Sequence, residues 1–122
     1  MAHGITWFEI PVTGWNRAKK FYQTLLKVDI EEREIGQSLM GILGTPEDGI
    51  NGALVMHEWY IPSEHGVLLY LDAGKDLNLM LARAEGAGAT VLIPKTQISE
   101  EIGYMAVFRD TEGNRIALHS RS

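Results

Sequence analysis

The sequence predicts an α+β fold made of two similar modules, each with the order β-α-β-β-β. A strand-like run at residues 5–12 leads into a helical stretch at 15–26, and a second run at 66–72 leads into a helical stretch at 76–85. Each pair continues into short apolar segments separated by Gly, Pro and Asp. A pattern that repeats after about sixty residues indicates two equivalent halves with a cleft between them.

The first strand alternates between two kinds of side chain, and its helix-facing positions are apolar: Phe8, Ile10 and Val12. The opposite positions hold Trp7, Glu9 and Pro11, a mixture that suits a cavity wall or a sheet edge better than a dry core. Thr13 is the expected N-cap of the first helix. That helix carries an apolar stripe at Ala18, Phe21, Tyr22, Leu25 and Leu26.

Three strands and a loop are expected to complete the first module. Residues 28–35 predict a charged strand near a sheet edge, and apolar strands are expected at 39–43 and 52–57. Turn-forming residues predict a loop at 45–49. The chain is expected to be one domain, 1–122, in three parts: module one at about 1–58, a linker at about 59–65 and module two at about 66–122.

The second module repeats this order. A strand at 68–72 precedes the helix at 76–85, which is expected to end at Gly86. Pro94 is expected to end the following strand. The turn at 110–114, rich in Asp and Gly, predicts a hairpin. The remaining strands are expected at 90–93, 105–108 and 115–119.

Composition and charge exclude several classes of protein. The 122 residues are 45% hydrophobic and 22% charged, as in ordinary globular domains. No apolar run is long enough for a bilayer and no leader is apparent, so a cytoplasmic location without membrane contact is expected. The absence of cysteine excludes disulfides and thiolate sites. A net charge of −5 argues against nucleic acid and favours cationic or neutral ligands.

Common cofactor and nucleophile motifs are missing. The glycines are scattered at turns and form neither a GxGxxG nor a GxxxxGK loop. No GxSxG elbow is present. The sequence therefore does not predict a Rossmann cofactor site, a P-loop or an α/β-hydrolase.

Three stretches resemble a known superfamily. WFEIPVTGWNRAKKFYQTLL is similar to its opening strand and helix, LYLDAGKDLNLMLARAEGAGATVLIPKT to the start of its second module, and FRDTEGNRIALHS to its closing hairpin. This is the vicinal oxygen chelate superfamily, which includes glyoxalase I, bleomycin-resistance proteins and extradiol dioxygenases. The resemblance implies paired βαβββ modules that form an open, cupped mixed sheet around a cavity. It also implies a homodimer, which in such families often completes the site.

The resemblance places the superfamily's metal ligands at residues that cannot bind a metal. Those points fall on Trp7, on Leu68 (Gly66 if the register shifts by two) and on Ala117. The remaining point falls near 55–57, where only His57 is a usual ligand. Because a divalent ion needs several converging donors, no metal and no other cofactor are expected.

Glu9 and His119 are the candidate catalytic residues. Glu9 would be a partly desolvated carboxylate available as an acid or base, or else a hydrogen-bonded structural group. His119 shares a strand face with Ala117 and would act as a base or a hydrogen-bond donor, or else be exposed near the terminus. Together with His57 they form a fallback metal set of two His and one carboxylate.

The candidate ligand contacts are Trp7, Met56, Tyr70, Tyr104 and Arg115. Trp7 would stack on a flat or cationic ligand, and otherwise would pack in a core. Tyr70 would offer a phenol to the cavity from the second module, and otherwise would fill space. Arg115 would pair with Glu9 or with a substrate carboxylate, and otherwise would be solvated.

Three functions are compatible with these features. The first is a small-molecule-binding protein of the glyoxalase/bleomycin-resistance type that lacks the usual metal site. The second is a lyase, isomerase or dioxygenase-like enzyme that uses a rearranged metal site or Glu9 and His119. The third is an interaction module whose cup is filled by its own side chains. The sequence leaves open whether the two modules pair within one chain or across a dimer.

Overall fold

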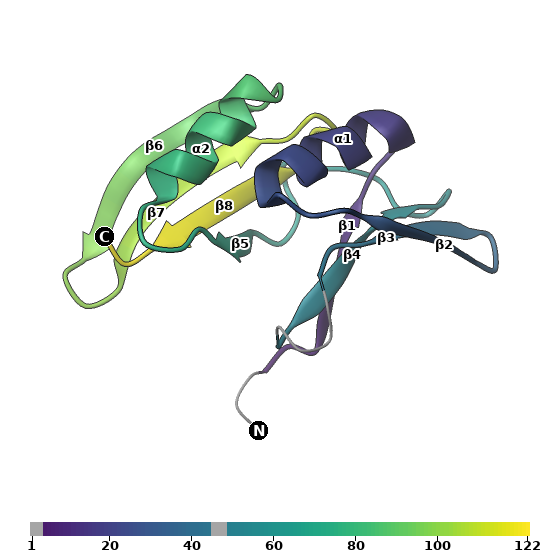
Figure 1. Ribbon diagram of the computed structural model, residues 1–122, viewed down its shortest axis with the longest axis horizontal. Helices are drawn as coiled ribbons and strands as arrows, with labels where there is room; N and C mark the ends of the chain where they lie inside the picture. The colour runs from purple at the N-terminus through teal and green to yellow at the C-terminus, as the bar shows by residue number, and fades with distance from the viewer. Residues whose placement is uncertain (1–3, 45–48) are drawn as a thin grey trace.

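The computed structural model describes residues 4–44 and 49–122 and shows the predicted order β-α-β-β-β twice (Figure 1). The first module contains β1 (Trp7–Pro11), α1 (Trp15–Leu26), β2 (Glu31–Ile35), β3 (Ser38–Ile42) and β4 (Asn51–Met56). The second contains β5 (Leu69–Asp72), α2 (Leu77–Gly86), β6 (Thr90–Ser99), β7 (Gly103–Arg109) and β8 (Arg115–Ser120). The predicted loop at 45–49 lies outside the described residues except for Gly49.

The strands form two mixed four-stranded sheets, which confirms the predicted α+β class. Their orders are β1-β4-β3-β2 and β5-β8-β7-β6. In each sheet the first strand of the module pairs in parallel with the last, and the other pairs are antiparallel. Figure 1 shows both helices on one side of the sheets. The opposite side of each sheet is called its open face below.

One hydrophobic core extends through both modules. Phe21 and Tyr22 of α1 are almost fully buried, with ring centroids 4.9 Å apart in an edge-to-face arrangement. Phe21 also packs against Phe108 of β7 at 5.9 Å, so the first helix contacts the second module. The predicted helix-facing positions Ile10 and Val12 belong to the same buried cluster. No helix among the described residues has both the length and the apolar character needed to cross a bilayer.

Two predictions at the ends of elements are wrong. Thr13 does not cap α1: the N-cap is Gly14, which makes no side-chain capping bond, because a carboxylate from the second module binds this terminus instead. Pro94 does not end β6, which continues to Ser99. The strand accommodates the proline because β6 is an edge strand and its register shifts between Ile93 and Thr96.

Gly103 begins β7 in a conformation that only glycine adopts easily. Its φ is +103°, and a Cβ there would collide with the backbone carbonyl of Ser120. Gly103→Ala is expected to lower the free energy of unfolding by about 3 kcal/mol, from backbone strain and overlap together. Gly113→Ala is the control, since φ is +95° but the surrounding space is open, and it should cost about 1 kcal/mol. Urea unfolding that gave equal losses for the two variants would contradict this account.

Candidate functional site

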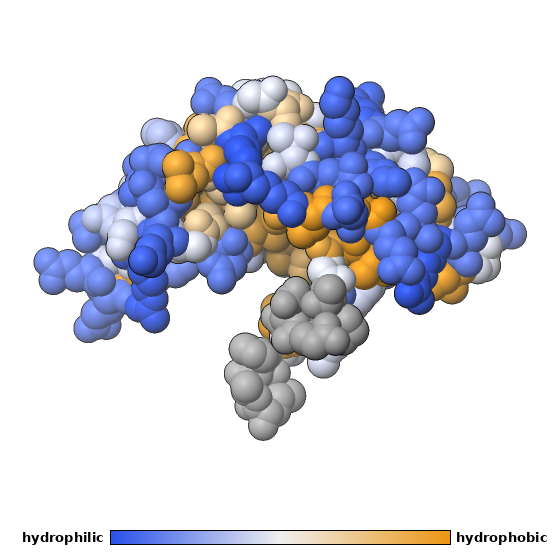
Figure 2. All heavy atoms as spheres, viewed as in Figure 1, coloured by the Kyte–Doolittle hydropathy of each residue, from blue (hydrophilic) through white to orange (hydrophobic). Residues whose placement is uncertain are grey.

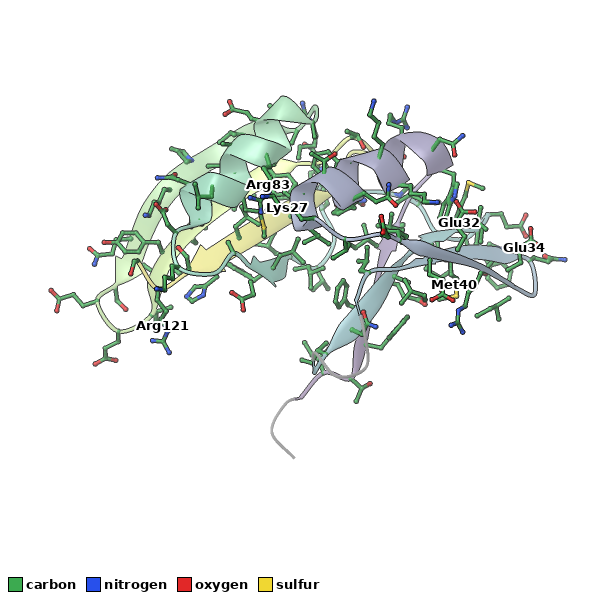
Figure 3. The ribbon with its side chains drawn as sticks, viewed as in Figure 1. Lys27, Glu32, Glu34, Met40, Arg83 and Arg121 are labelled. Carbon is green, nitrogen blue, oxygen red and sulfur yellow. The ribbon has the colours of Figure 1, made fainter. Side chains whose placement is uncertain are left out.

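The open face of the first sheet carries the mixed residues predicted from the alternation of β1. Trp7 and Glu9 face away from the helices, in register with Asn51 and Ala53 of β4. In Figure 3, Glu32 of β2 points toward α1, and Met40 of β3 lies on the other side of the sheet. The hydrogen bonds from Trp15 and Lys19 to Glu32 confirm which side belongs to the helix.

Glu9 is the centre of a small aromatic cluster on this face. Its Oε2 accepts a hydrogen bond from the Trp7 indole Nε1 at 3.2 Å, and its Oε1 accepts one from the Tyr60 hydroxyl at 2.7 Å. The hydrogen bond to Glu9 and, secondly, burial raise the pKa of Tyr60 above its ordinary value, so the phenol stays protonated and donates. Both partners are neutral, and no ion pair of the described residues includes Glu9.

The segment after β4 brings Tyr60 to Glu9. The His57 ring packs edge-on against Trp59 at 5.6 Å and against Tyr60 at 5.8 Å. His57 Nδ1 also accepts a hydrogen bond from the Trp59 backbone N–H at 3.1 Å. The sequence indicated a linker here and missed the contact of Tyr60, although two adjacent aromatic residues in a polar segment were a signal for one.

The second sheet contributes a separate hollow. Tyr70 and Asp72 of β5 are in register with Ala117 and His119 of β8 and share its open face. Tyr70, Asp72 and His119 line a hollow of about 430 Å³ together with Ile102. His119 Nε2 lies 2.6 Å from the Ile102 carbonyl oxygen, so the tautomer with its proton on Nε2 donates to that carbonyl.

A smaller cavity lies where the two modules meet. It measures about 200 Å³ and lies between β1, the segment 61–67 and the start of β8. Glu9 and Arg115 both line it, and so do the apolar side chains of Ile61 and Val67. The structure therefore brings together Glu9 and Arg115 from the predicted set, whereas Tyr70 and His119 line the other hollow.

Met56 and Tyr104 lie elsewhere. Both are partly buried against the main core, on the side of the sheets that faces the helices. The Lys95 ammonium lies 4.7 Å from the centre of the Tyr104 ring. Strand register accounts for this placement, because Met56 and Tyr104 follow the alternation of the core residues rather than that of Glu9 and His119.

The described residues do not fit a divalent metal ion. Within residues 4–44 and 49–122, no three His, Cys, Asp or Glu side chains are grouped so as to hold one. Trp7 and Ala117, where the resemblance places two of the superfamily's ligands, have no side-chain lone pair that could bind a metal ion. His119 of the fallback set lies on the second sheet, whereas Glu9 and His57 belong to the first module.

The hairpin turn between β7 and β8 holds the cavity in place, a role that turn composition alone did not reveal. The buried Asp110 carboxylate accepts hydrogen bonds from the Tyr22 hydroxyl at 2.5 Å, from the Asn114 side chain at 3.1 Å, and from the backbone N–H groups of Glu112 and Asn114. Asn114 also donates to the Pro11 carbonyl and accepts from the Ser63 N–H. One turn thus joins α1, β1 and the linker.

Glu112 joins the same turn to the N-terminus of α1. Its carboxylate accepts from the backbone N–H groups of Gly14 and Thr13 at 2.6 and 3.0 Å and from Arg17 Nε at 2.7 Å. Burial acts to raise the pKa of Glu112, but the bonds from Arg17, Gly14, Thr13 and Thr111 outweigh it and lower that pKa to about 2. A carboxylate at this position also stabilises the positive end of the helix dipole.

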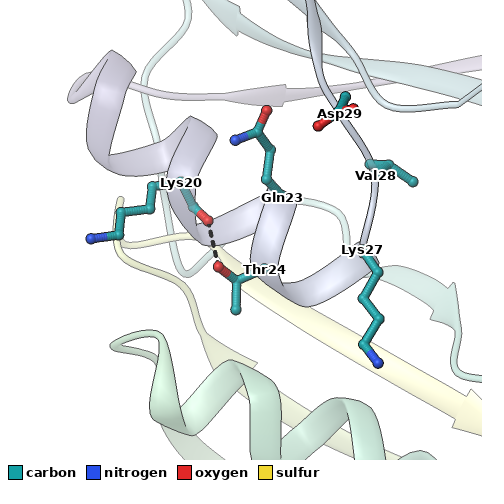
Figure 4. A pocket seen from close by; sticks show the side chains of 6 residues that line it. All are labelled: Lys20, Gln23, Thr24, Lys27, Val28 and Asp29. Atoms are coloured by element: carbon teal, nitrogen blue, oxygen red, sulfur yellow. Dashed lines mark hydrogen bonds between the residues drawn. The ribbon is translucent and has the colours of Figure 1, made fainter.

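Two further depressions lie outside the cluster around Glu9. Figure 4 shows a shallow pocket at the end of α1, where Thr24 donates to the Lys20 carbonyl at 2.9 Å and Gln23 accepts from the Ile30 N–H. A groove of about 550 Å³ runs between the modules with largely apolar walls, including Phe8 and Leu69. Apolar residues gather in the middle of the molecule, below the polar helix surface, in Figure 2.

Known structures share this fold over almost the whole chain. The antibiotic-binding protein TnmS3 from Streptomyces sp. CB03234 is 25% identical, with a TM-score of 0.67 over 100% of this chain and 99% of that chain. A glyoxalase/bleomycin resistance protein from Albidiferax ferrireducens T118 is 19% identical, with a TM-score of 0.71 over 98% and 100%. Glyoxalase I from Zea mays is 12% identical, with a TM-score of 0.74 over 97% of this chain and 44% of that chain.

Sequence comparison gives the family. No curated protein sequence is similar enough to count as a match. The profile of one superfamily matches residues 4–118, which include both modules and all the site residues described above except His119. With the repeated βαβββ order, the open sheet faces and the structural neighbours, this match shows that the chain belongs to the Glyoxalase/Bleomycin resistance protein/Dioxygenase superfamily.

Proposed function

We propose that this protein binds a small molecule on the open faces of its sheets and does so without the superfamily's metal site. The cluster of Glu9, Trp7 and Tyr60 carries the proposal, because it places a carboxylate among aromatic rings on an uncovered sheet face beside a cavity. A few oriented polar groups among apolar walls are typical of small-molecule sites. The antibiotic-binding protein TnmS3, similar over the whole chain, supports the same function.

A second copy of the chain is part of this proposal. Large apolar side chains are exposed in the segment after β4: Trp59 is 81% exposed, and Ile61 and Val67, which line the cavity, are 74% and 98% exposed. Exposed apolar residues gathered at one place favour a protein interface. The strands β1 and β5 are edge strands, the kind of strand that can pair with another chain. A homodimer that covers these residues would turn two open faces into an enclosed site.

The experiment is a ligand screen followed by substitution on each side of the sheet. Trp7→Ala is expected to weaken binding of the ligands found by about tenfold or more, since it removes an aromatic surface from the open face. Leu79→Ala is the control, because Leu79 is exposed on α2. Equal affinities of the two variants, measured by calorimetry, would contradict the proposal.

Two measurements on the same samples separate the parts of the proposal. Sedimentation of the wild-type protein should give the mass of two chains. If the protein instead binds the ligand as a monomer, only the dimer part of the proposal is wrong. Mass spectrometry of the recovered ligand should show it unchanged. Conversion of the ligand would instead favour the alternative, an enzyme that uses Glu9 or His119 as acid or base.

A further inference from the structure

Arg115 carries a donor with no acceptor. It is the first residue of β8 and one of the residues that line the 200 Å³ cavity between the modules. Arg115 Nε is buried and is the one buried side-chain nitrogen or oxygen of the described residues without a hydrogen-bond partner. Buried polar atoms in folded proteins are nearly always paired, and each exception calls for a physical explanation.

The neighbouring arginine shows that the position is unusual. Arg109 of β7 lies directly opposite Arg115 in the strand register. Arg109 forms an ion pair with Glu64 at 3.0 Å and a hydrogen bond with Thr90. Arg115 takes part in no ion pair of the described residues, although Glu9 lines the same cavity. The cavity is thus lined by an arginine and a glutamate that form no ion pair with each other.

We propose that this cavity binds a small zwitterionic group, with its carboxylate on Arg115 and its amine beside Glu9. The guanidinium offers the planar donor edge that suits a carboxylate. Glu9 accepts one bond on each oxygen, from Trp7 and from Tyr60, and each oxygen has a further lone pair for an ammonium. This inference rests on the proposed function and names the charged end of its ligand.

Size and wall chemistry limit the ligand further. A volume of about 200 Å³ is below the roughly 300–1,000 Å³ of pockets that enclose drug-sized molecules. Ile61, Val67 and Leu69 form the apolar walls, so a short hydrocarbon spacer between the two charges would be covered. A monoanion would give Glu9 no opposite charge, and a monocation would give Arg115 none. Both should therefore bind this cavity more weakly than a zwitterion does.

The test uses simple ω-amino acids as probes. Calorimetry or ligand-observed NMR is run with glycine, 3-aminopropanoate, 4-aminobutanoate and 5-aminopentanoate, and with butanoate and butylamine as single-charge controls. One member of the series should bind the wild-type protein at least about tenfold more tightly than either control, because it makes two charged contacts instead of one. A series in which no member exceeds the single-charge compounds would overturn the proposal.

Matched variants identify the two charged contacts. Arg115→Met and Glu9→Gln should each weaken binding of the best probe about tenfold or more, whereas Arg109→Met should leave it unchanged. Arg115→Met should stay folded, since it keeps the side-chain volume and removes an unpaired donor. If the methionine variant loses its circular dichroism spectrum, Arg115→Lys replaces it. Lysine keeps the positive charge but lacks the planar guanidinium that binds a carboxylate through two hydrogen bonds. Unchanged binding in the folded Arg115 variant would overturn the proposal.

The outcome distinguishes this inference from the proposed function. If the library ligands bind in a manner that depends on Trp7 but no amino acid binds, only the zwitterion assignment fails. Binding that requires Arg115 but not Glu9 would show a carboxylate site and would also overturn it. If a bridging water, and not a ligand, accepts the hydrogen bond from Arg115 Nε, the Arg115→Met variant should bind the best probe as tightly as the wild type does. That result would overturn the proposal.

Discussion

Asp110→Ala is expected to lower the free energy of unfolding by about 3–5 kcal/mol. Asp110 is only 4% exposed, and it accepts hydrogen bonds from Tyr22, from Asn114 and from two backbone N–H groups. Alanine would leave the Tyr22 hydroxyl without an acceptor in a fully buried position. Chemical unfolding, followed by circular dichroism, gives the loss.

Two further variants show whether the cause is the unpaired donor. Asp72→Ala removes an exposed carboxylate that accepts one hydrogen bond, from Gly74, and should cost well under about 1 kcal/mol. Adding Tyr22→Phe to Asp110→Ala should recover about 1 kcal/mol or more, because it removes the orphaned hydroxyl. If Asp110→Ala cost no more than Asp72→Ala, the turn would not be the junction described above.

Glu112 is expected to make the stability of the fold depend on pH in the acid range. Its pKa is about 2 in the folded protein against an ordinary value of 4.5, so the folded state favours the charged form. That stabilisation is present above about pH 4.5 and is lost as the pH falls toward 2. The difference corresponds to about 2–3 kcal/mol, allowing for solvent screening of the exposed Arg17. Unfolding curves between pH 6 and pH 2.5 would show the decline.

Glu112→Gln is the matched variant for this pH dependence. Glutamine can still accept a hydrogen bond from Gly14 or Thr13 but has no charge to lose. Its free energy of unfolding should be lower than that of the wild type at pH 6, and the difference between the two curves should shrink as the pH falls toward 2. Parallel curves over the whole range would show that other carboxylates cause the acid sensitivity.

The sequence predicted those features that depend on neighbouring residues. Alternation placed Ile10 in the core and Glu9 on the open face, as the structure confirms. The charged run before Ile35 was expected near an edge, and β2 is an edge strand with every residue exposed. The repeated order of elements followed from the same periodicities.

Local sequence patterns did not predict contacts between residues that are far apart in the sequence. Gly14 and Glu112 are 98 residues apart in sequence, so local capping rules selected Thr13 instead. Tyr60 reaches Glu9 across 51 residues. The two adjacent aromatic residues of the linker indicate a contact there, but they do not specify its partner. The unpaired Arg115 Nε likewise depends on which residues surround the start of β8 in the fold, not on the identity of the residue.

The three tryptophan indoles allow the most direct test of the central claim, that ligands bind the open faces. Trp7 lies on the open face at Glu9, whereas Trp15 lies on the helix side and donates to Glu32. In a ¹H–¹⁵N spectrum recorded during titration with a ligand from the screen, the Trp7 indole signal should move and the Trp15 signal should stay. Movement of the Trp15 signal while the Trp7 signal stays in place would contradict the claim.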